Sequence, residues 1–136
     1  MISFIFWSLA AICNSIMDMT DHHYSRSVFK NLNPLWWDGN ISWKNKYLRE
    51  TPNLELKKLF PYKKGFLGEI NYPTQLTDAW HFFKTLMIIF LTLSVVTFDK
   101  NLISSWLGYM IIFIVYYLFW NFWYNLFYNH ILHSKK

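Results

Sequence analysis

The chain has 136 residues, of which 54% are hydrophobic, 22% aromatic and only 15% charged. Disordered chains have the opposite balance, so this composition excludes intrinsic disorder. A single cysteine excludes a disulfide framework and a cysteine-rich zinc site. The apolar residues form three long runs with most of the charge between the first two, which is the pattern of a polytopic membrane protein.

The three apolar runs are Ile2 to Met17, Phe82 to Phe98 and Leu102 to Tyr128. As one helix the third run would be about 40 Å long, enough to cross a bilayer and project from it. The first two runs are shorter, but they span if their polar ends lie among the headgroups. The sequence therefore predicts an all-α integral membrane protein forming a single membrane domain, residues 1–136, with transmembrane helices at about 2–25, 77–98 and 102–132.

The first run has a competing interpretation as a secretory signal. Such a signal needs a positively charged start, and residues 1–7 contain no lysine or arginine. A lipoprotein signal ending at Cys13 needs a small residue at position 12, which is Ile12. We therefore expect a membrane-spanning helix in which Cys13 is a packing residue.

The basic residues predict the orientation. The segment from Arg26 to Lys64 is rich in lysine and arginine, whereas the connection between the second and third runs holds only Lys100. The positive-inside rule then places the long segment and the C-terminus in the cytoplasm and the N-terminus outside. The basic segment should contact anionic lipid headgroups. Nucleic acid is the rival partner for a basic chain, but no binding motif supports it, and we expect none.

Residues 26–76 are predicted to form a Trp-rich interfacial segment on the cytoplasmic surface of the membrane. The stretch NPLWWDGNISWKNKY carries three tryptophans and two lysines, and indole rings favour the boundary between lipid and water. Asn53 to Phe60 could form a short helix. Thr77 is the expected N-cap of the second transmembrane helix, with Asp78 at its first position.

Polar side chains gather where the three predicted helices reach the cytoplasmic side. Ionisable groups at this depth are costly unless paired or hydrated, so they indicate a site. If the helices bundle, these groups can meet in one place. They are Asp18, Asp21, His22, His23, Asp78, His81, His130 and His133.

Asp and His suit a divalent transition metal such as Zn, Fe or Mn, and an i, i+3 spacing lets one helix give two ligands to one ion. Such an ion would activate water for hydrolysis or headgroup transfer on a lipid. The expected metal ligands are Asp21, His22, Asp78, His81, His130 and His133. The expected acid–base catalysts are Asp18, Asp78 and His81, with Ser25, Asn125 and Asn129 orienting substrate or ligands. The sequence does not decide whether His22 or His23 faces the bundle.

Each candidate also has a structural interpretation. Asp78 could be only a helix-terminal charge, the asparagines of the third run could hydrogen-bond between helices, and the histidines could contact headgroups. The preferred function is a metal-dependent enzyme acting on a lipid or lipid-linked substrate. The alternative is a non-enzymatic small subunit of a larger membrane complex, with the polar cluster structural or a proton relay. Three helices offer a thin core, so a homo-oligomer or a membrane-protein partner is expected under either hypothesis.

Two stretches, ISWKNKY at Ile41–Tyr47 and LTDAWHFFK at Leu76–Lys84, resemble segments of uncharacterised small polytopic membrane proteins common in Bacteroidetes and their phages. The resemblance covers roughly half the chain, from Asn14 to Lys84. Where that pattern has Gly-Asp-Pro and Gly-Ser-Thr-Thr stretches, this sequence has LRETPNLELKK and GEINYP. The resemblance implies a bacterial or phage inner-membrane protein and no particular activity.

Overall fold

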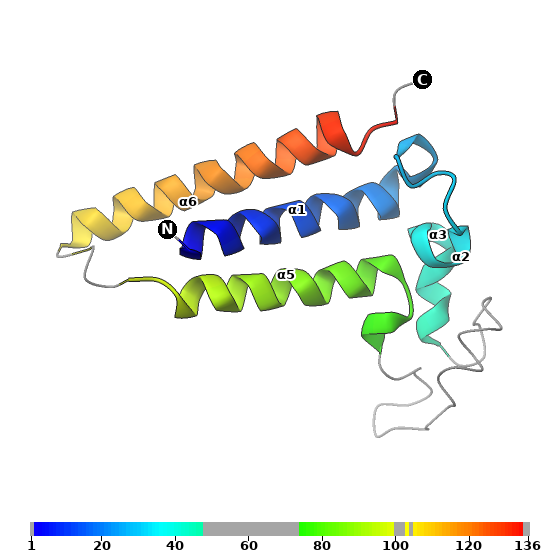
Figure 1. The fold of residues 1–136 in the computed structure, drawn as a ribbon, viewed down its shortest axis with the longest axis horizontal. Helices are drawn as coiled ribbons and strands as arrows, with labels where there is room; N and C mark the ends of the chain where they lie inside the picture. The colour runs from blue at the N-terminus through cyan, green and yellow to red at the C-terminus, as the bar shows by residue number, and fades with distance from the viewer. Residues whose placement is uncertain (1, 48–73, 100–102, 104, 135–136) are drawn as a thin grey trace.

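The computed structural model describes residues 2–47, 74–99, 103 and 105–134. Three long helices lie side by side: α1 (Ile2–His22), α5 (Ala79–Val96) and α6 (Trp106–Leu126). Each is long and apolar enough to cross a membrane, as the sequence predicted. A π-helical turn, Phe127–Ile131, extends α6, and the two chain termini lie towards opposite ends of the bundle (Figure 1).

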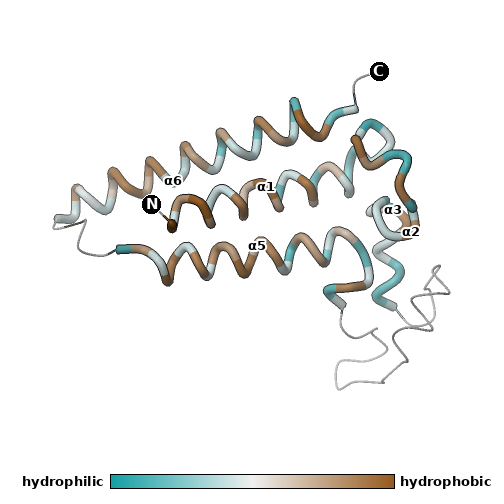
Figure 2. Tube along the Cα trace, viewed as in Figure 1, coloured by the Kyte–Doolittle hydropathy of each residue, from teal (hydrophilic) through white to brown (hydrophobic). Residues whose placement is uncertain are grey.

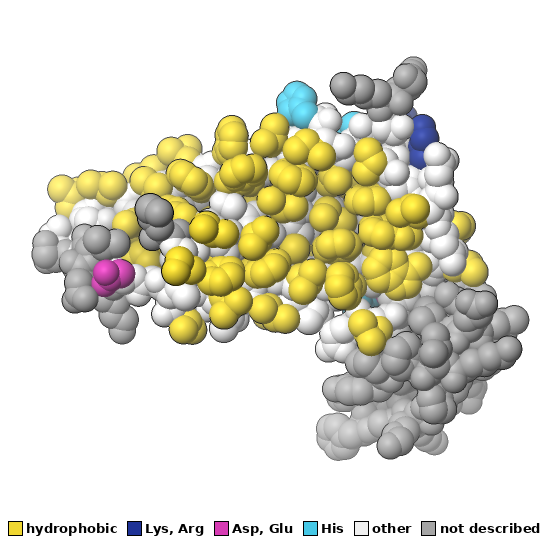
Figure 3. All heavy atoms as spheres, viewed as in Figure 1, with side chains coloured by type: hydrophobic (Ala, Val, Ile, Leu, Met, Phe, Trp, Pro, Cys, Tyr) yellow, Lys and Arg dark blue, Asp and Glu magenta, His cyan; other side chains and the backbone are white. Residues whose placement is uncertain are grey.

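Helix α1 lies between the other two, so α5 and α6 pack mainly against α1 rather than against each other (Figure 1). Its small residues Ala10, Ala11 and Ser15 are fully buried, which lets the neighbouring backbones approach closely. No residue of α6 is buried, because this helix uses only one side for packing. Hydrophobic side chains cover the visible face of the bundle between its ends, as expected for a surface in contact with lipid (Figure 3).

Helices α5 and α6 both begin at side-chain caps. The carboxylate of Asp78 accepts the N–H of His81, and the hydroxyl of Ser105 accepts the N–H of Gly108. The predicted cap at Thr77 is therefore one residue too early. The carboxylate of Asp78 reaches the third N–H of the helix, whereas the Thr77 hydroxyl lies 2.7 Å from the carbonyl of Thr74.

Aromatic contacts join α1 to α6. The indole of Trp7 donates to the carbonyl of Tyr116 at 2.8 Å and meets the ring of Trp120 edge-on. Phe4 stacks on Tyr116 with ring centroids 4.4 Å apart. Near the same end, Ser3 hydrogen-bonds both Ser94 of α5 and the hydroxyl of Tyr116, so contacts at this one residue link all three helices.

Short helical turns follow α1: η1 (Tyr24–Arg26), α2 (Pro34–Trp37), α3 (Gly39–Ser42) and η2 (Trp43–Lys46). Helix α1 thus ends at His22, before the predicted residue 25. The ring of Trp37 stacks on Phe29 at 4.4 Å and lies 6.1 Å from Phe83 of α5. Trp37 is therefore packed against the start of α5, while Trp43 is 43% exposed.

The position of this segment on the membrane surface stays a prediction. The expected helix at Asn53–Phe60 lies outside the described residues.

Tyr24, in η1, stabilises the chain between α1 and α2 by donating to the carbonyl of Leu32 at 2.7 Å. Loss of hydration, with the Asp38 charge second, raises the pKa of Tyr24, so its hydroxyl stays protonated as a donor into alkaline pH.

Candidate functional site

At one end of the bundle, α1 and α6 finish and α5 begins. We call this end the polar end. Hydrophilic residues gather here, beside α2 and α3, while the long helices are mostly hydrophobic (Figure 2). The predicted site residues lie at these helix ends or in the turns that follow them. Two separate groups form there, one on each side of α1.

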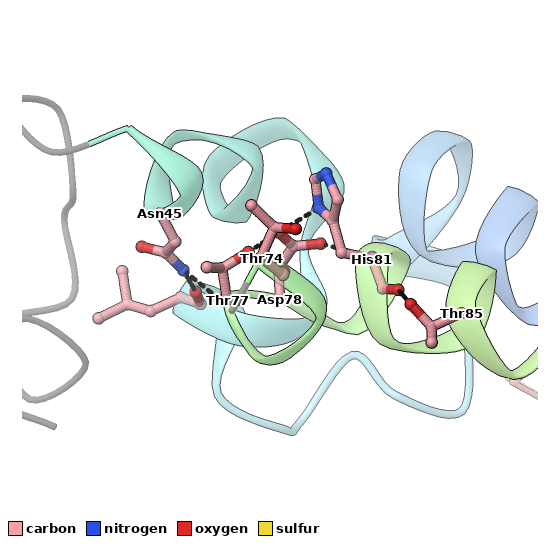
Figure 4. A network of polar contacts seen from close by, with 7 residues as sticks. Asn45, Thr74, Thr77, Asp78, His81 and Thr85 are labelled. Carbon is pink, nitrogen blue, oxygen red and sulfur yellow. Dashed lines mark hydrogen bonds and ion pairs between the residues drawn. The ribbon is translucent and has the colours of Figure 1, made fainter. Parts of the chain in front are cut away.

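The first group centres on Asp78 and His81, at the start of α5 (Figure 4). Asp78 is 1% exposed. One carboxylate oxygen, Oδ1, accepts the backbone N–H of His81 at 2.9 Å, and the other, Oδ2, lies 2.7 Å from Nδ1 of the imidazole. The carboxylate therefore fixes both the start of the helix and the orientation of the ring. The His81 side chain is 19% exposed, and its second nitrogen points away from Asp78 (Figure 4).

Further polar residues anchor this pair. The hydroxyl of Thr77 lies 2.9 Å from Oδ2 of Asp78, and the backbone carbonyl of Thr77 accepts the side-chain amide of Asn45 at 3.1 Å. Asn45 and Thr77 are both buried, at 0% and 2% exposed. The amide of Asn45 also donates to the carbonyl of Leu35. This network connects the start of α5 to η2 and α2, so the tertiary fold, and not α5 alone, holds the pair.

A small polar pocket adjoins Asp78. Its volume is about 200 Å³, and it is lined by Asp21, Gly39, Ser42, Trp43, Lys46, Asp78 and Trp80. Gly39 is required for its shape, because a Cβ there would lie 2.7 Å from the Cα of Asp21. Because Asp21 and Asp78 both line this pocket, they face the same cavity, although they come from different helix ends.

The second group lies between α1 and α6. The hydroxyl of Tyr124 donates to Oδ2 of Asp18 at 2.7 Å. The ring of His23 lies 6.0 Å from Tyr128 and 6.4 Å from His133. Two backbone hydrogen bonds tie this corner to the residues after α6: the N–H of Val28 donates to the carbonyl of Leu132, and the N–H of Ser134 donates to the carbonyl of Arg26. Asp18 thus has the partner that its depth requires, and that partner is a tyrosine on α6.

The structure does not bring the predicted metal ligands to one point. Asp21, Asp78 and His81 lie on the α5 side of α1, whereas His133 contacts the α6 side. His22 is exposed, 3.7 Å from Asp21, and His23 rather than His22 contacts the bundle. Four other predicted site residues are exposed: Ser25, Asn125, Asn129 and His130. Within the described ranges, no group of three or more Asp, Glu, His or Cys could hold a metal ion. The division arises because α1 is interposed between α5 and α6.

Sequence reasoning missed Tyr124 and Asn45, and it expected Thr77 only as a helix cap. A signal for the first exists, because Tyr116, Trp120 and Tyr124 repeat every four residues and so share the face of α6 that packs on α1. Asn45 and Thr77 lie 32 residues apart, and their contact follows no local pattern.

A second cavity lies near the opposite end. It is an open groove of about 490 Å³ between α5 and α6, with α1 contributing Trp7. Aromatic side chains, Tyr109, Phe113 and Tyr117 of α6 among them, line most of it, and no Asp, Glu, His, Lys or Arg does. It is an apolar groove remote from Asp78 and His81.

The fold and site define a class: an all-helical protein with three helices able to span a membrane and a buried Asp–His pair at one end. No family model matches the chain, and neither a curated protein nor a solved structure matches it.

Proposed function

We propose that this protein is a small membrane enzyme in which Asp78 and His81 carry out acid–base chemistry on a lipid or lipid-linked substrate at the polar end. The observation that carries the proposal is the 2.7 Å contact between a nearly inaccessible carboxylate and Nδ1 of a partly exposed imidazole. This arrangement orients a histidine as a general base.

The chemistry follows from the inventory of donors and acceptors. When Nδ1 carries a proton and donates it to Asp78, the other ring nitrogen, Nε2, has a free lone pair. That nitrogen takes a proton from an attacking water or hydroxyl and returns it to the leaving group. Asp78 holds the ring in this tautomer, and Thr77 and Asn45 hold Asp78.

A helix cap alone does not explain the arrangement. Capping needs one side-chain oxygen, and Oδ1 of Asp78 already serves the backbone N–H of His81. The second oxygen is directed at the imidazole, and the residue is buried although helix-capping carboxylates are usually exposed. A buried carboxylate is costly, which favours a function beyond starting the helix.

A small pocket that adjoins Asp78, and that His81 itself does not line, supports a small polar group as the part of the substrate bound next to the pair. Its volume of about 200 Å³ suits a headgroup rather than an acyl chain, and it combines Lys46 with the carboxylates of Asp21 and Asp78. The exposed apolar face of α5 beyond the pocket, with Ile88 and Ile89, leaves room for attached chains in the surrounding lipid.

The proposal is tested by incubating purified protein with vesicles of bacterial polar lipids and comparing lipid species by mass spectrometry. We expect wild type to convert at least one lipid class and His81→Gln to lose at least 100-fold in rate, the usual contribution of a general base. His130→Gln is the matched control, because His130 is exposed on the π-helical turn that extends α6. No conversion by wild type, or equal rates in wild type and His81→Gln, would contradict the proposal.

The metal-dependent form of the hypothesis has its own test. Asp78 and His81 could provide two ligands, but the described residues supply no third ligand beside them. Protein purified without chelator or His-tag should be analysed for Zn, Fe and Mn by mass spectrometry. If the protein binds one or two equivalents of metal, and both His81→Ala and His130→Ala lose them, the hypothesis of a single metal centre is supported. Activity that survives with no bound metal would support the metal-free pair.

A further inference from the structure

The outward face of α6 carries polar side chains in a helix that otherwise faces lipid. Tyr116, Trp120 and Tyr124 contact α1, so the opposite side of α6 lies about 180° away around the helix. Asn125 and Asn129 lie on that opposite side and are both exposed. They continue a row of exposed apolar residues that includes Leu118 and Phe122, at 58% and 59% exposed.

These amides are only partly satisfied within α6. Asn125 donates to the backbone carbonyl of Asn121 at 2.8 Å, and Asn129 donates to Oδ1 of Asn125 at 3.1 Å. An asparagine amide offers two N–H donors and an oxygen that accepts two hydrogen bonds. Each side chain therefore retains hydrogen-bonding capacity, which hydrocarbon cannot meet.

Asn125 lies within the apolar part of α6. The candidate membrane-spanning stretch runs from Trp106 to Ile131, and Asn125 is inside it. A shallow open groove of about 390 Å³ runs beside it, lined by Asn121, Phe122, Asn125, Leu126 and His130. A partner helix can therefore approach this side without displacing a described element.

We propose that this face binds α6 of a second copy of the same chain, with Asn125 hydrogen-bonding to Asn125 across a two-fold axis along the membrane normal. Copies inserted with the same topology place each residue at the same depth, so residues near the axis of a symmetric pair meet their own counterparts. Asparagine is both donor and acceptor, so it is complementary to itself. Asparagines in transmembrane helices associate by this means.

The proposal is tested in lipid vesicles by energy transfer between copies labelled with donor and acceptor, as a function of protein-to-lipid ratio. Wild type should dimerise reversibly, and Asn125→Leu/Asn129→Leu should weaken dimerisation about 10-fold. Asn125→Gln keeps both the donor and the acceptor of the amide, so this variant should dimerise as wild type does. Tyr117→Leu, which removes an exposed hydroxyl from the flank of α6, should have no effect.

Cross-linking provides a readout that does not depend on stability. In a Cys13→Ala background, Asn125→Cys should form a disulfide-linked dimer on mild oxidation, and Tyr117→Cys should not. A wild-type protein that stays monomeric at every ratio would overturn the proposal. So would a double Leu variant that dimerises as well as wild type, or equal cross-linking at both positions.

Discussion

The carboxylate of Asp78 binds His81 twice, at the backbone N–H through one oxygen and at Nδ1 of the ring through the other, at 2.9 and 2.7 Å. The first contact is local to the start of α5. The second gives the residue a role that a cap alone would not need, and it leads to a prediction that separates the two.

Asp78→Asn should be less destabilising than Asp78→Ala. Asparagine still offers an oxygen to the N–H of His81, whereas alanine loses the cap, which costs about 1 kcal/mol, and leaves a buried network without its centre. Thermal unfolding of the detergent-solubilised variants, followed by circular dichroism, measures the difference. If Asp78 is catalytic as well as structural, both variants lose lipid conversion while only the alanine variant loses substantial stability. Equal stability losses would show that the second oxygen, not the cap, dominates.

Tyr124→Phe should destabilise the protein by about 1–3 kcal/mol, because it removes the hydroxyl that donates to the half-buried carboxylate of Asp18. Asp18→Asn combined with Tyr124→Phe should cost less than the sum of the two single changes, since the pair acts as a unit. Denaturant titration of all four proteins in the same detergent gives the coupling energy. Strict additivity would mean that the 2.7 Å contact contributes nothing to stability.

Gly39→Ala should lower stability by about 1–3 kcal/mol, because the new Cβ would lie 2.7 Å from the Cα of Asp21 and the backbone must shift. Gly108→Ala is the control. Its Cβ would lie 2.9 Å from a side-chain methyl, Cγ2 of Ile103, rather than from backbone, and alanine favours helix, so we expect a smaller loss. Melting temperatures of the two variants make the comparison. A Gly39→Ala protein as stable as wild type would mean that α3 is not held tightly against α1.

The C-terminus should lie in the cytoplasm and the connection between α5 and α6 outside. The basic residues of the segment after α1 predict this, and three spans place the two termini on opposite sides of the membrane. A phosphatase fused after Asp99 should be active in the periplasm, whereas one fused at the C-terminus should be inactive. The opposite pattern would invert the orientation, and activity in both fusions would exclude three spans.

Some features are decided within a few residues of the chain, and these the sequence predicted well. The number and extent of the long helices follow from the lengths of the apolar runs. A helix satisfies its own backbone hydrogen bonds, and a bilayer stabilises a helix whose apolar surface matches the thickness of its hydrocarbon core. The error at the start of α5 is a single residue. Thr77 and Asp78 are both good caps, and only the backbone geometry decides which one reaches the N–H of His81.

The grouping of the polar residues depended on the tertiary structure. Chain order places Asp18, Asp78, His81 and His133 at one end of a bundle, but it does not say which helix lies in the middle. Because α1 carries the small buried residues Ala10, Ala11 and Ser15, both other helices pack on it, and the predicted single cluster becomes two. Helix length is a property of one segment in its solvent. A site is a property of several faces meeting, and which faces meet is decided by side-chain packing between segments far apart in the chain.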